Sequence, residues 1–300
     1  MDANQMLELL FGGIAIGCIY SLIALGYSMI IKATEILNFA QGEVMMLGSM
    51  FGISLLWILP FPFIVIFFLT IALTGFFSLL MELVVFRVLR NRRVPLINIV
   101  MATVGMSILL QNVARLIWGS EPLSYPPIFK TAAYFLGSVR LPAQYLAVVV
   151  LGLVLMITLQ LFFKKSRTGI ALQAAAQDPE TAQLMGINLN RTVSYTFFIS
   201  GGMAGAAGTL LGPMFFSTFD MGFMTGIKSF VAASLGGLGS ITGAMLGGII
   251  FGVLETFGAL WISSAYKDAI GMILLIVILL VFPNGLIGLR DGRRFRDGRR

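Results

Sequence analysis

Seven long apolar runs without a single charged residue make up most of this 300-residue chain. A helix needs about 20 apolar residues to cross the hydrocarbon core of a bilayer, and each run reaches or exceeds that length. The runs occupy residues 9–31, 44–81, 94–114, 141–163, 192–219, 229–254 and 269–289. Hydrophobic residues amount to 58% of the chain and charged residues to 11%, which is unlike a soluble protein. The sequence therefore predicts an all-α polytopic membrane protein, with residues 1–300 forming a single transmembrane domain.

Basic residues mark one side of the membrane. Thirteen of the 20 lysines and arginines lie in three clusters, each next to the end of an apolar run. The clusters are Arg87, Arg90, Arg92 and Arg93; Lys164, Lys165 and Arg167; and six arginines in residues 290–300. Cytoplasmic loops carry such an excess of positive charge, so we place all three clusters, including the basic tail 290–300, in the cytoplasm. The loop 119–140 then lies outside, and the net charge of +7 does not indicate a nucleic-acid partner.

Three apolar runs separate the cytoplasmic Arg191 from the cytoplasmic tail, and three full crossings would end on the wrong side. One run must therefore be broken, re-entrant or crossed twice. The glycine-rich residues 236–243, preceded by Lys228, are the best candidate, and residues 36–59 offer a counterpart in the other half. Two repeats with one interrupted segment each are typical of transporters, whose pathway lies where those segments meet. The alternative is a pair of short tilted spans.

This pattern predicts about eight hydrophobic helical elements, within a range of seven to ten. If residues 36–59 are a half-crossing, the amino terminus is cytoplasmic. Residues 1–8 contain no basic residue and no small-residue cleavage pattern follows them, so we expect the first apolar run to remain in the mature protein.

A polar interruption precedes the second apolar run and contains Asn38, Gln41, Gly42 and Glu43. Ionisable groups at membrane depth are costly and rare, which makes Glu43 a candidate for the translocation path. Gly42 allows the backbone to leave helical geometry, and the two amides can donate and accept hydrogen bonds. The cluster either caps a broken helix or faces a polar substrate. By contrast, Glu82, Arg115 and Glu255 lie near span ends, where we expect their side chains to reach the interface.

Two rows of glycines at helical spacing predict close helix packing. Small residues let helix backbones approach each other in lipid, so these rows indicate contact surfaces first, and function only if a face slides or lines a path. The rows are Gly201, Gly205, Gly208 and Gly212, and Gly239, Gly243 and Gly247.

The longest polar stretch between spans, residues 164–191, predicts a cytoplasmic helical corner. Alanine and glutamine favour a helix around Ala175 that ends before Pro179. Asp178 is then placed to cap a second short helix, with Glu180 in its first turn and Gly186 as its stop. A rigid corner of this kind suggests a docking element for a cytoplasmic partner. An amphipathic loop resting on the membrane is the alternative.

Three motifs together resemble the LivH-type permease subunits of branched-chain amino acid ABC importers. They are NFAQGE at residues 38–43 followed by MMLG at 45–48, QAAAQDP at 173–179 followed by Ala182 and residues 184–187, and FPNGLIG at 282–288. With the first span, the resemblance covers residues 10 to 289. The second motif is similar to the coupling loop of that family.

The resemblance implies a multi-pass permease of the bacterial inner membrane, surrounded by lipid. Its implied partners are a second permease subunit (LivM-like) or a second copy of itself, two cytoplasmic ATPase subunits and a periplasmic substrate-binding protein. Branched-chain or other small hydrophobic amino acids are the implied substrates, and relatives for urea, short amides and other small solutes keep alternatives open. No cofactor is implied.

Other classes of function fit the residues less well. The chain has no Gly-x-x-x-x-Gly-Lys-Ser/Thr loop, so we expect no ATPase site of its own. An autonomous channel or secondary transporter would account for two interrupted segments but not for the cytoplasmic corner. An intramembrane enzyme would need a catalytic constellation, whereas the chain has no histidine and one cysteine, Cys18.

Overall fold

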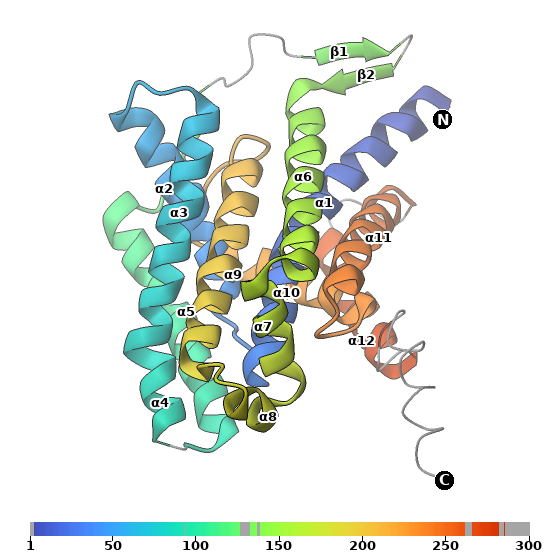
Figure 1. Cartoon of the computed structure of the whole chain (residues 1–300). Coiled ribbons are helices and arrows are strands. Elements are labelled where there is room, and N and C mark those ends of the chain that lie inside the picture. Colours follow the sequence, from blue (N-terminus) through green and yellow to red (C-terminus); the bar gives the residue numbers. More distant parts are fainter. Residues whose placement is uncertain are drawn as a thin grey trace.

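The computed structural model describes residues 3–92, 94–126, 133–136, 139–261, 266–281 and 285. The basic tail 290–300, Arg93 and most of the motif at 282–288 lie outside the described residues. Within the described part, six helical stretches are long and apolar enough to cross a membrane. Three further helices, at residues 189–211, 221–236 and 267–281, lie among them (Figure 1).

The first half of the chain forms four long helices before an external hairpin. Its elements are α1 (Ala3–Thr34), α2 (Gln41–Ile58), α3 (Phe63–Met81), the π-helix η1 (Glu82–Phe86), α4 (Arg87–Asn91) and α5 (Leu96–Trp118). The apolar run 44–81 is split into α2 and α3 near Pro60 and Pro62, since proline removes a backbone donor. The strands β1 (Ala133–Leu136) and β2 (Val139–Pro142) pair antiparallel after α5.

The second half contains five membrane helices and the cytoplasmic corner. Its elements are α6 (Ala143–Lys165), α7 (Arg167–Gln177), α8 (Pro179–Leu184), α9 (Leu189–Leu211), α10 (Met221–Gly236), α11 (Ile241–Trp261) and α12 (Lys267–Val281). Helix α9 lies at the centre, where nearly every residue from Ser200 onward is buried.

The ends of the bundle differ in charge, as the positive clusters predict. Helix α4 and the α7–α8 corner lie at one end, and the β-hairpin lies at the other (Figure 1). A Cβ added at Gly12 of α1 would contact the ring of Tyr145 at the hairpin end. Ala33, near the other end of α1, shares a cavity with Arg90 and Pro179. The amino end of α1 therefore lies at the hairpin end, opposite Arg90 and the α7–α8 corner. If the basic clusters are cytoplasmic, as the positive-inside rule predicts, this end is external, which differs from the expectation for a half-crossing at residues 36–59.

The reason is that α2, of 18 residues, and α10, of 16 residues, are each preceded by a non-helical segment that completes a crossing. Residues 35–40 lead into α2, and residues 212–220 lead into α10. Both helices begin inside the bundle, where Gln41 contacts Ser200 in the middle of α9. Each non-helical segment and the helix that follows it together run from one end of the bundle to the other, as a broken span does, rather than returning to the end that they left (Figure 1). The glycine-rich residues 236–243 provide the break between α10 and α11.

The glycine row of α9 packs as predicted. Cβ atoms added at Gly201 and Gly205 would collide with Ser78 and Thr74 of α3, and one added at Gly208 would collide with the Met45 carbonyl of α2. The last member of the row, Gly212, lies equally close to Tyr125. Close backbone approach therefore joins α9 to both neighbours.

The second glycine row was predicted only in part. Gly243 and Gly247 of α11 lie against Gly236 and Ala232 of α10. Gly239 precedes α11 and lies in the turn with a φ of +82°, where glycine is favoured because it has no side chain. It is a turn residue and not a helix-packing residue.

Candidate functional site

The amino ends of α2 and α10 meet in the middle of the bundle. A Cβ added at Gly42 would collide with the Gly222 carbonyl and come within 2.9 Å of the Gly226 Cα. The two backbones can approach so closely only because glycines, which have no side chain, lie at the contact on both helices. The motif at 38–43 and the start of α10, more than 170 residues apart in sequence, are thus brought together at mid-membrane depth.

The polar residues of the motif are buried and have different partners. Asn38 accepts a hydrogen bond from the Ala40 amide at 3.2 Å, within the turn that precedes α2. Gln41 donates to the Ser200 carbonyl of α9 at 3.2 Å, and Glu43 accepts from the Ser107 hydroxyl of α5 at 3.2 Å. Asn38 thus stabilises the turn before α2, whose start has no side-chain cap, whereas Gln41 and Glu43 link α2 to other helices.

Four polar atoms around this point are buried without a hydrogen-bond partner among the described residues. They are Asn38 Nδ2, Gln41 Oε1, Glu43 Oε2 and Ser200 Oγ. Buried polar groups are nearly always paired, and a cluster of exceptions indicates a place for water or a polar ligand. The cluster offers both donors and acceptors, and the carboxylate can hold a cation.

A cavity of about 410 Å³ lies beside this cluster, between α5 and α10. Ser107, which donates to Glu43, is part of its wall. The lining combines apolar side chains with the carboxylate of Asp220 and is made of Phe39, Val104, Ser107, Ile108, Gln111, Asp220, Phe223 and Met224. The cavity is large enough for a small amino acid.

Glu255 belongs to a buried charge network and does not reach the interface as expected. The side chain of Glu255 is fully buried on α11, 2.7 Å from the ammonium of Lys228 on α10. Lys228 also lies 2.6 Å from Asp268 of α12, and Tyr20 of α1 donates to Glu255 at 2.8 Å. The pairing offsets the cost of burying these charges, and it joins α10 to α11 and α12, while Tyr20 joins α1 to α11. Arg115, by contrast, is exposed, above the ring of Phe219.

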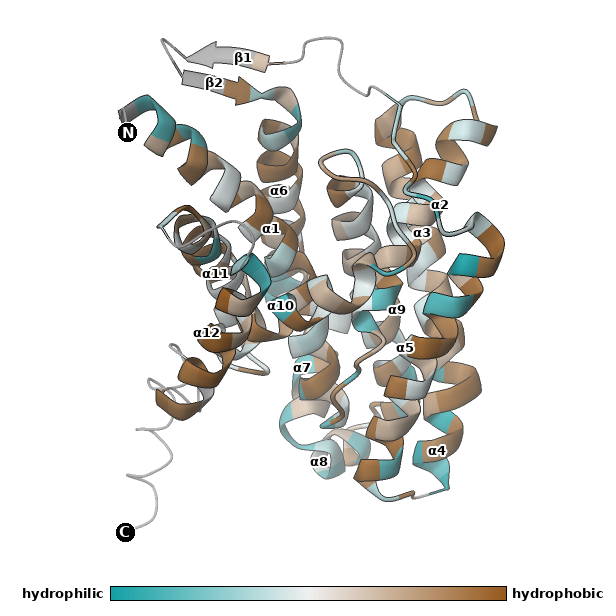
Figure 2. Ribbon diagram, turned by 180° about the vertical axis from the view of Figure 1, so that it is seen from behind, coloured by the Kyte–Doolittle hydropathy of each residue, from teal (hydrophilic) through white to brown (hydrophobic). Residues whose placement is uncertain are grey.

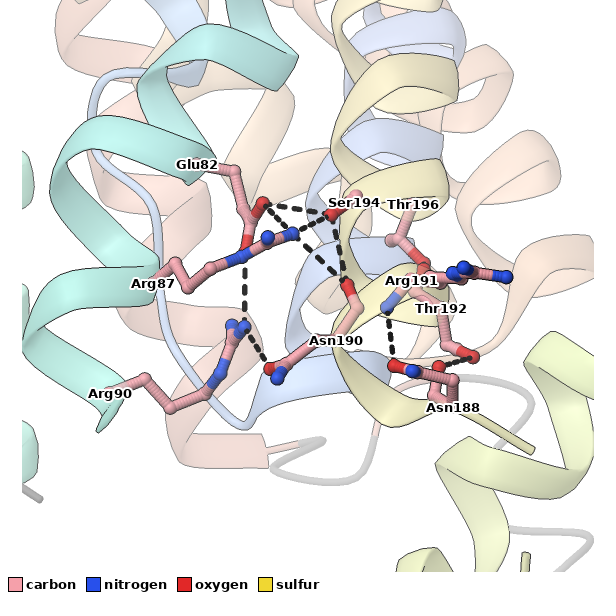
Figure 3. A network of polar contacts seen from close by, with 9 residues as sticks. All are labelled: Glu82, Arg87, Arg90, Asn188, Asn190, Arg191, Thr192, Ser194 and Thr196. Atoms are coloured by element: carbon pink, nitrogen blue, oxygen red, sulfur yellow. Dashed lines mark hydrogen bonds and ion pairs between the residues drawn. The ribbon is translucent and has the colours of Figure 1, made fainter. Parts of the chain in front are cut away.

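Glu82 is also fully buried, which corrects the same expectation. Its carboxylate lies 3.0 Å from both Arg87 and Arg90 and accepts a hydrogen bond from Ser194 at 2.9 Å (Figure 3). Arg90 also donates to Asn190 at 3.1 Å. Because Ser194 and Asn190 belong to α9, this network holds the cytoplasmic end of α3–α4 against the amino end of the central helix.

The cytoplasmic corner has the predicted local structure. Helix α7 ends at Gln177, and Asp178 caps α8 by accepting from the Thr181 amide at 3.0 Å. This contact and the Thr181 hydroxyl lower the pKa of Asp178. Pro179 occupies the first position of α8, and Gly186 has a φ of +84°. Both helix boundaries therefore follow from the sequence.

Other residues of the corner contribute differently. Ala175 is buried on α7, and Glu180 lies in the first turn of α8, where a negative charge is favourable. A cavity of about 600 Å³ lies between the corner, Arg90 and the start of α9. The sequence did not reveal this link between the corner and the Glu82 network, because the residues involved lie about 100 positions apart.

Helices that begin and meet inside the bundle, with a capped helix pair at the end that carries the basic residues, are typical of a multi-pass membrane transport protein. Comparison with known proteins agrees. Residues 9–279 match the family described as "Branched-chain amino acid transport system / permease component". The chain belongs to this family, and it is a multi-pass protein of the inner membrane.

Curated relatives match over nearly their whole length. The chain is 37% identical to the high-affinity branched-chain amino acid transport system permease protein LivH of Salmonella typhimurium, covering 94% of this chain and 95% of the relative. It is 38% identical to the permease protein BraD of Pseudomonas aeruginosa over 96% and 97%. A probable LivH of Methanocaldococcus jannaschii is 30% identical over 93% and 92%.

Proposed function

We propose that this chain is the membrane-spanning permease subunit of an ABC importer for branched-chain or other small hydrophobic amino acids. LivH of Salmonella typhimurium and BraD of Pseudomonas aeruginosa are described as high-affinity branched-chain amino acid transport system permease proteins, which supports the substrate class. The partners are a second permease subunit, two cytoplasmic ATPase subunits and a periplasmic substrate-binding protein. The chain itself has no ATPase activity.

The capped α7–α8 corner is the observation that carries this proposal. A short helix with a cap, an initiating proline and a glycine stop is rigid for its size. It lies beside Arg90 and the start of α9, so a displacement of α8 would be transmitted to α9, the central helix. ATP-driven closure of the ATPase pair moves this corner and shifts the membrane helices between outward and inward access.

The path runs past the meeting point of α2 and α10. Asn38, Gln41 and Glu43 supply polar groups there, and Gly42 keeps the two helices close. The carboxylate of Glu43 suits the ammonium group of an amino acid, while the apolar wall of the neighbouring cavity suits its side chain. Both interactions are favourable only at a site shielded from lipid and bulk water.

Reconstitution tests the proposal. In proteoliposomes, the complete complex with its binding protein should take up leucine only when ATP is supplied. This chain alone should neither hydrolyse ATP nor accumulate leucine. Concentrative uptake by the lone chain on a proton or sodium gradient would overturn the ABC assignment. Uptake of urea or a short amide without competition by leucine would overturn the substrate class.

Two substitutions test the corner as the coupling element. Asp178→Ala removes the cap, and Gly186→Val opposes a left-handed backbone conformation. The double variant should remain in the membrane but lose ATPase subunits on purification. Asp178→Asn is the matched control, because asparagine caps as well as aspartate does. Normal ATPase recovery and uptake in the double variant would move the coupling role to another cytoplasmic segment.

A further inference from the structure

A cavity of about 350 Å³ lies between the first turns of α7 and α9 and has a positively charged wall. Arg167 of α7 and Arg191 of α9 both line it, and neither side chain forms an ion pair with a residue that the structure describes. Glu82, by contrast, pairs with Arg87 and Arg90, and the side chain of Arg191 points away from that network (Figure 3). The cavity therefore brings two cationic groups together without a balancing carboxylate.

The wall of the cavity offers hydrogen-bond donors to a bound group. Its polar side chains are Arg167, Thr168, Asn188, Arg191, Thr192 and Tyr195. Each of them can donate a hydrogen bond, and no carboxylate belongs to the wall among the described residues. A guanidinium group can donate two parallel hydrogen bonds to the oxygens of a phosphate. The wall therefore fits an anionic group with several acceptor oxygens.

The cavity lies where two membrane helices reach the basic end of the bundle. Helix α6 is apolar enough to cross the membrane and ends at Lys165, two residues before Arg167. Along α9, Arg191, Tyr195 and Phe198 are exposed at spacings of four and three residues, so they share one helix face. Their order follows the change from charged headgroups to hydrocarbon, and tyrosine is enriched at that boundary. The cavity is therefore at the level of the phospholipid headgroups.

A soluble partner fits this surface less well than a lipid does. The side chains of Tyr195 and Phe198 are 52% and 38% exposed, and a cytoplasmic subunit would have to enter the membrane to cover them. An acyl chain covers such a face without cost, because it is as apolar as the residues that it contacts. The cytoplasmic leaflet also contains anionic lipids, whose headgroups are bound by basic pockets between membrane helices.

We propose that the cavity between α7 and α9 binds the phosphate headgroup of an anionic phospholipid. Arg167 and Arg191 hold the phosphate from the two helices, and an acyl chain lies along Tyr195 and Phe198. The inference needs only the membrane location of the chain and goes beyond the proposed transport function.

The bound lipid would act next to the cytoplasmic corner. The cavity shares Gly186 and Asn188 with the larger cavity beside Arg90, so a headgroup in it contacts the segment that joins α8 to α9. A phosphate held by both helices ties α7 to α9. The position of the corner then depends on the lipid composition of the membrane.

Native mass spectrometry of the complete complex tests the site. The complex is exchanged into detergent that contains equal amounts of phosphatidylglycerol and phosphatidylcholine, and the bound lipids are identified by mass. We expect the unmodified complex to retain one more phosphatidylglycerol per copy of this chain than the double variant Arg167→Gln/Arg191→Gln. Equal retention by these two complexes would overturn the inference.

A matched control separates a defined site from general attraction between charges. The double variant Lys164→Gln/Lys165→Gln removes the same charge beside the cavity, but neither lysine belongs to its wall. It should retain phosphatidylglycerol as the unmodified complex does. Equal loss of lipid from the lysine and arginine variants would show a general charge effect and refute the site.

Two further outcomes would identify a different occupant. An excess of inorganic phosphate should not displace the lipid, and a phosphate ion retained in place of the lipid would overturn the lipid assignment. An arginine variant that keeps its lipid but loses the ATPase subunits would assign the two arginines to the ATPase contact.

Thermal unfolding gives a second readout that does not require a variant with unchanged stability. Adding phosphatidylglycerol to the delipidated subunit should raise its melting temperature, because a ligand that binds the folded state stabilises it. The same addition should raise the melting temperature of the arginine variant less. Equal increases for both proteins would contradict the proposal.

Uptake assays separate this inference from the proposed function. In proteoliposomes, ATP-dependent uptake should increase with the fraction of phosphatidylglycerol for the unmodified complex and the lysine variant, but not for the arginine variant. An equal increase for the arginine variant would contradict the tie between α7 and α9. Absence of ATP-dependent uptake in every lipid mixture would refute the proposed function, while retention of phosphatidylglycerol by the unmodified complex alone would still support the lipid site.

Discussion

Gly42 and Gly105 are the same residue type under opposite constraints. At Gly42 a methyl group would collide with the backbone of α10, whereas at Gly105 it would meet nothing in the chain. From sequence, both are simply glycines in apolar surroundings. Only the three-dimensional arrangement separates a glycine required for internal packing from one whose side-chain position is empty within the described chain.

Alanine substitutions should reveal that difference. Gly42→Ala forces α2 and α10 apart, and overpacking of this kind typically costs about 1–3 kcal/mol. We expect a lower melting temperature for the purified subunit and loss of uptake by the complex. Gly105→Ala is the control and should melt like the unmodified subunit. Equal melting temperatures for the two variants would contradict the close approach of the two helices.

The buried pair of Lys228 and Glu255 makes a second prediction. Removing one partner of a buried ion pair typically costs about 3–5 kcal/mol, because the other charge stays buried. Lys228→Met should therefore lower the melting temperature strongly, since Glu255 is fully buried. Adding the Glu255→Gln substitution should restore part of the lost melting temperature, because it removes the buried carboxylate that has no cationic partner. If the two effects are simply additive, the two side chains are not coupled.

Burial of Glu82 and Glu255 could not be predicted from the sequence. Each lies close to a span end, a position from which side chains ordinarily reach water. Their partners in the bundle include Ser194 and Tyr20, which are more than 100 positions away. Contacts over such separations have no local sequence pattern, and a single sequence gives no pairing information.

Elements with local signals were predicted well. The boundaries of α7 and α8 followed from Pro179, Asp178 and Gly186, because capping and turn preferences act within a few residues. The interruption before α2 was also visible, since polar residues break an apolar run. The start of α10 was harder to see, because residues 212–220 are largely apolar and Asp220 alone marks the helix start.

The α8 cap gives a prediction with a defined pH dependence. Hydrogen bonds from Thr181 lower the pKa of Asp178, so the folded state holds the carboxylate more strongly than the unfolded state does. The stabilisation is present above the unfolded pKa of about 4 and is lost as the pH falls through the lower folded pKa. Between pH 6 and 8 it should be constant.

Hydrogen exchange of the α8 amides measures this effect. Asp178→Ala should speed exchange at pH 7, whereas Asp178→Asn should leave it near the original rate. The ratio between the alanine variant and the unmodified chain should be the same at pH 6 and pH 8. A ratio that changes across this interval would show that another titrating group controls α8.

At the scale of the whole molecule, the charge pattern predicts which end of the bundle is cytoplasmic, but it did not determine the path of the first span. The error came from treating residues 36–59 as returning to the side they left. In the structure, residues 35–40 and α2 together complete a crossing, and residues 212–220 with α10 do the same in the opposite direction (Figure 1). Apolar run lengths cannot distinguish a re-entrant segment from an extended segment joined to a short helix.

The resulting topology is testable by cysteine accessibility in intact cells. Cys18 is fully buried and should not react, so any labelling comes from the introduced cysteines. Gln5→Cys, near the amino end of α1, and Ser124→Cys should react with a membrane-impermeant maleimide from outside. Lys165→Cys should react only after the membrane is opened, because its cluster is cytoplasmic. Protection of position 5 together with reactivity of position 124 would place the amino end of α1 inside. That result would require residues 35–58 to be re-entrant, and the meeting of α2 and α10 at mid-membrane depth would then be incorrect.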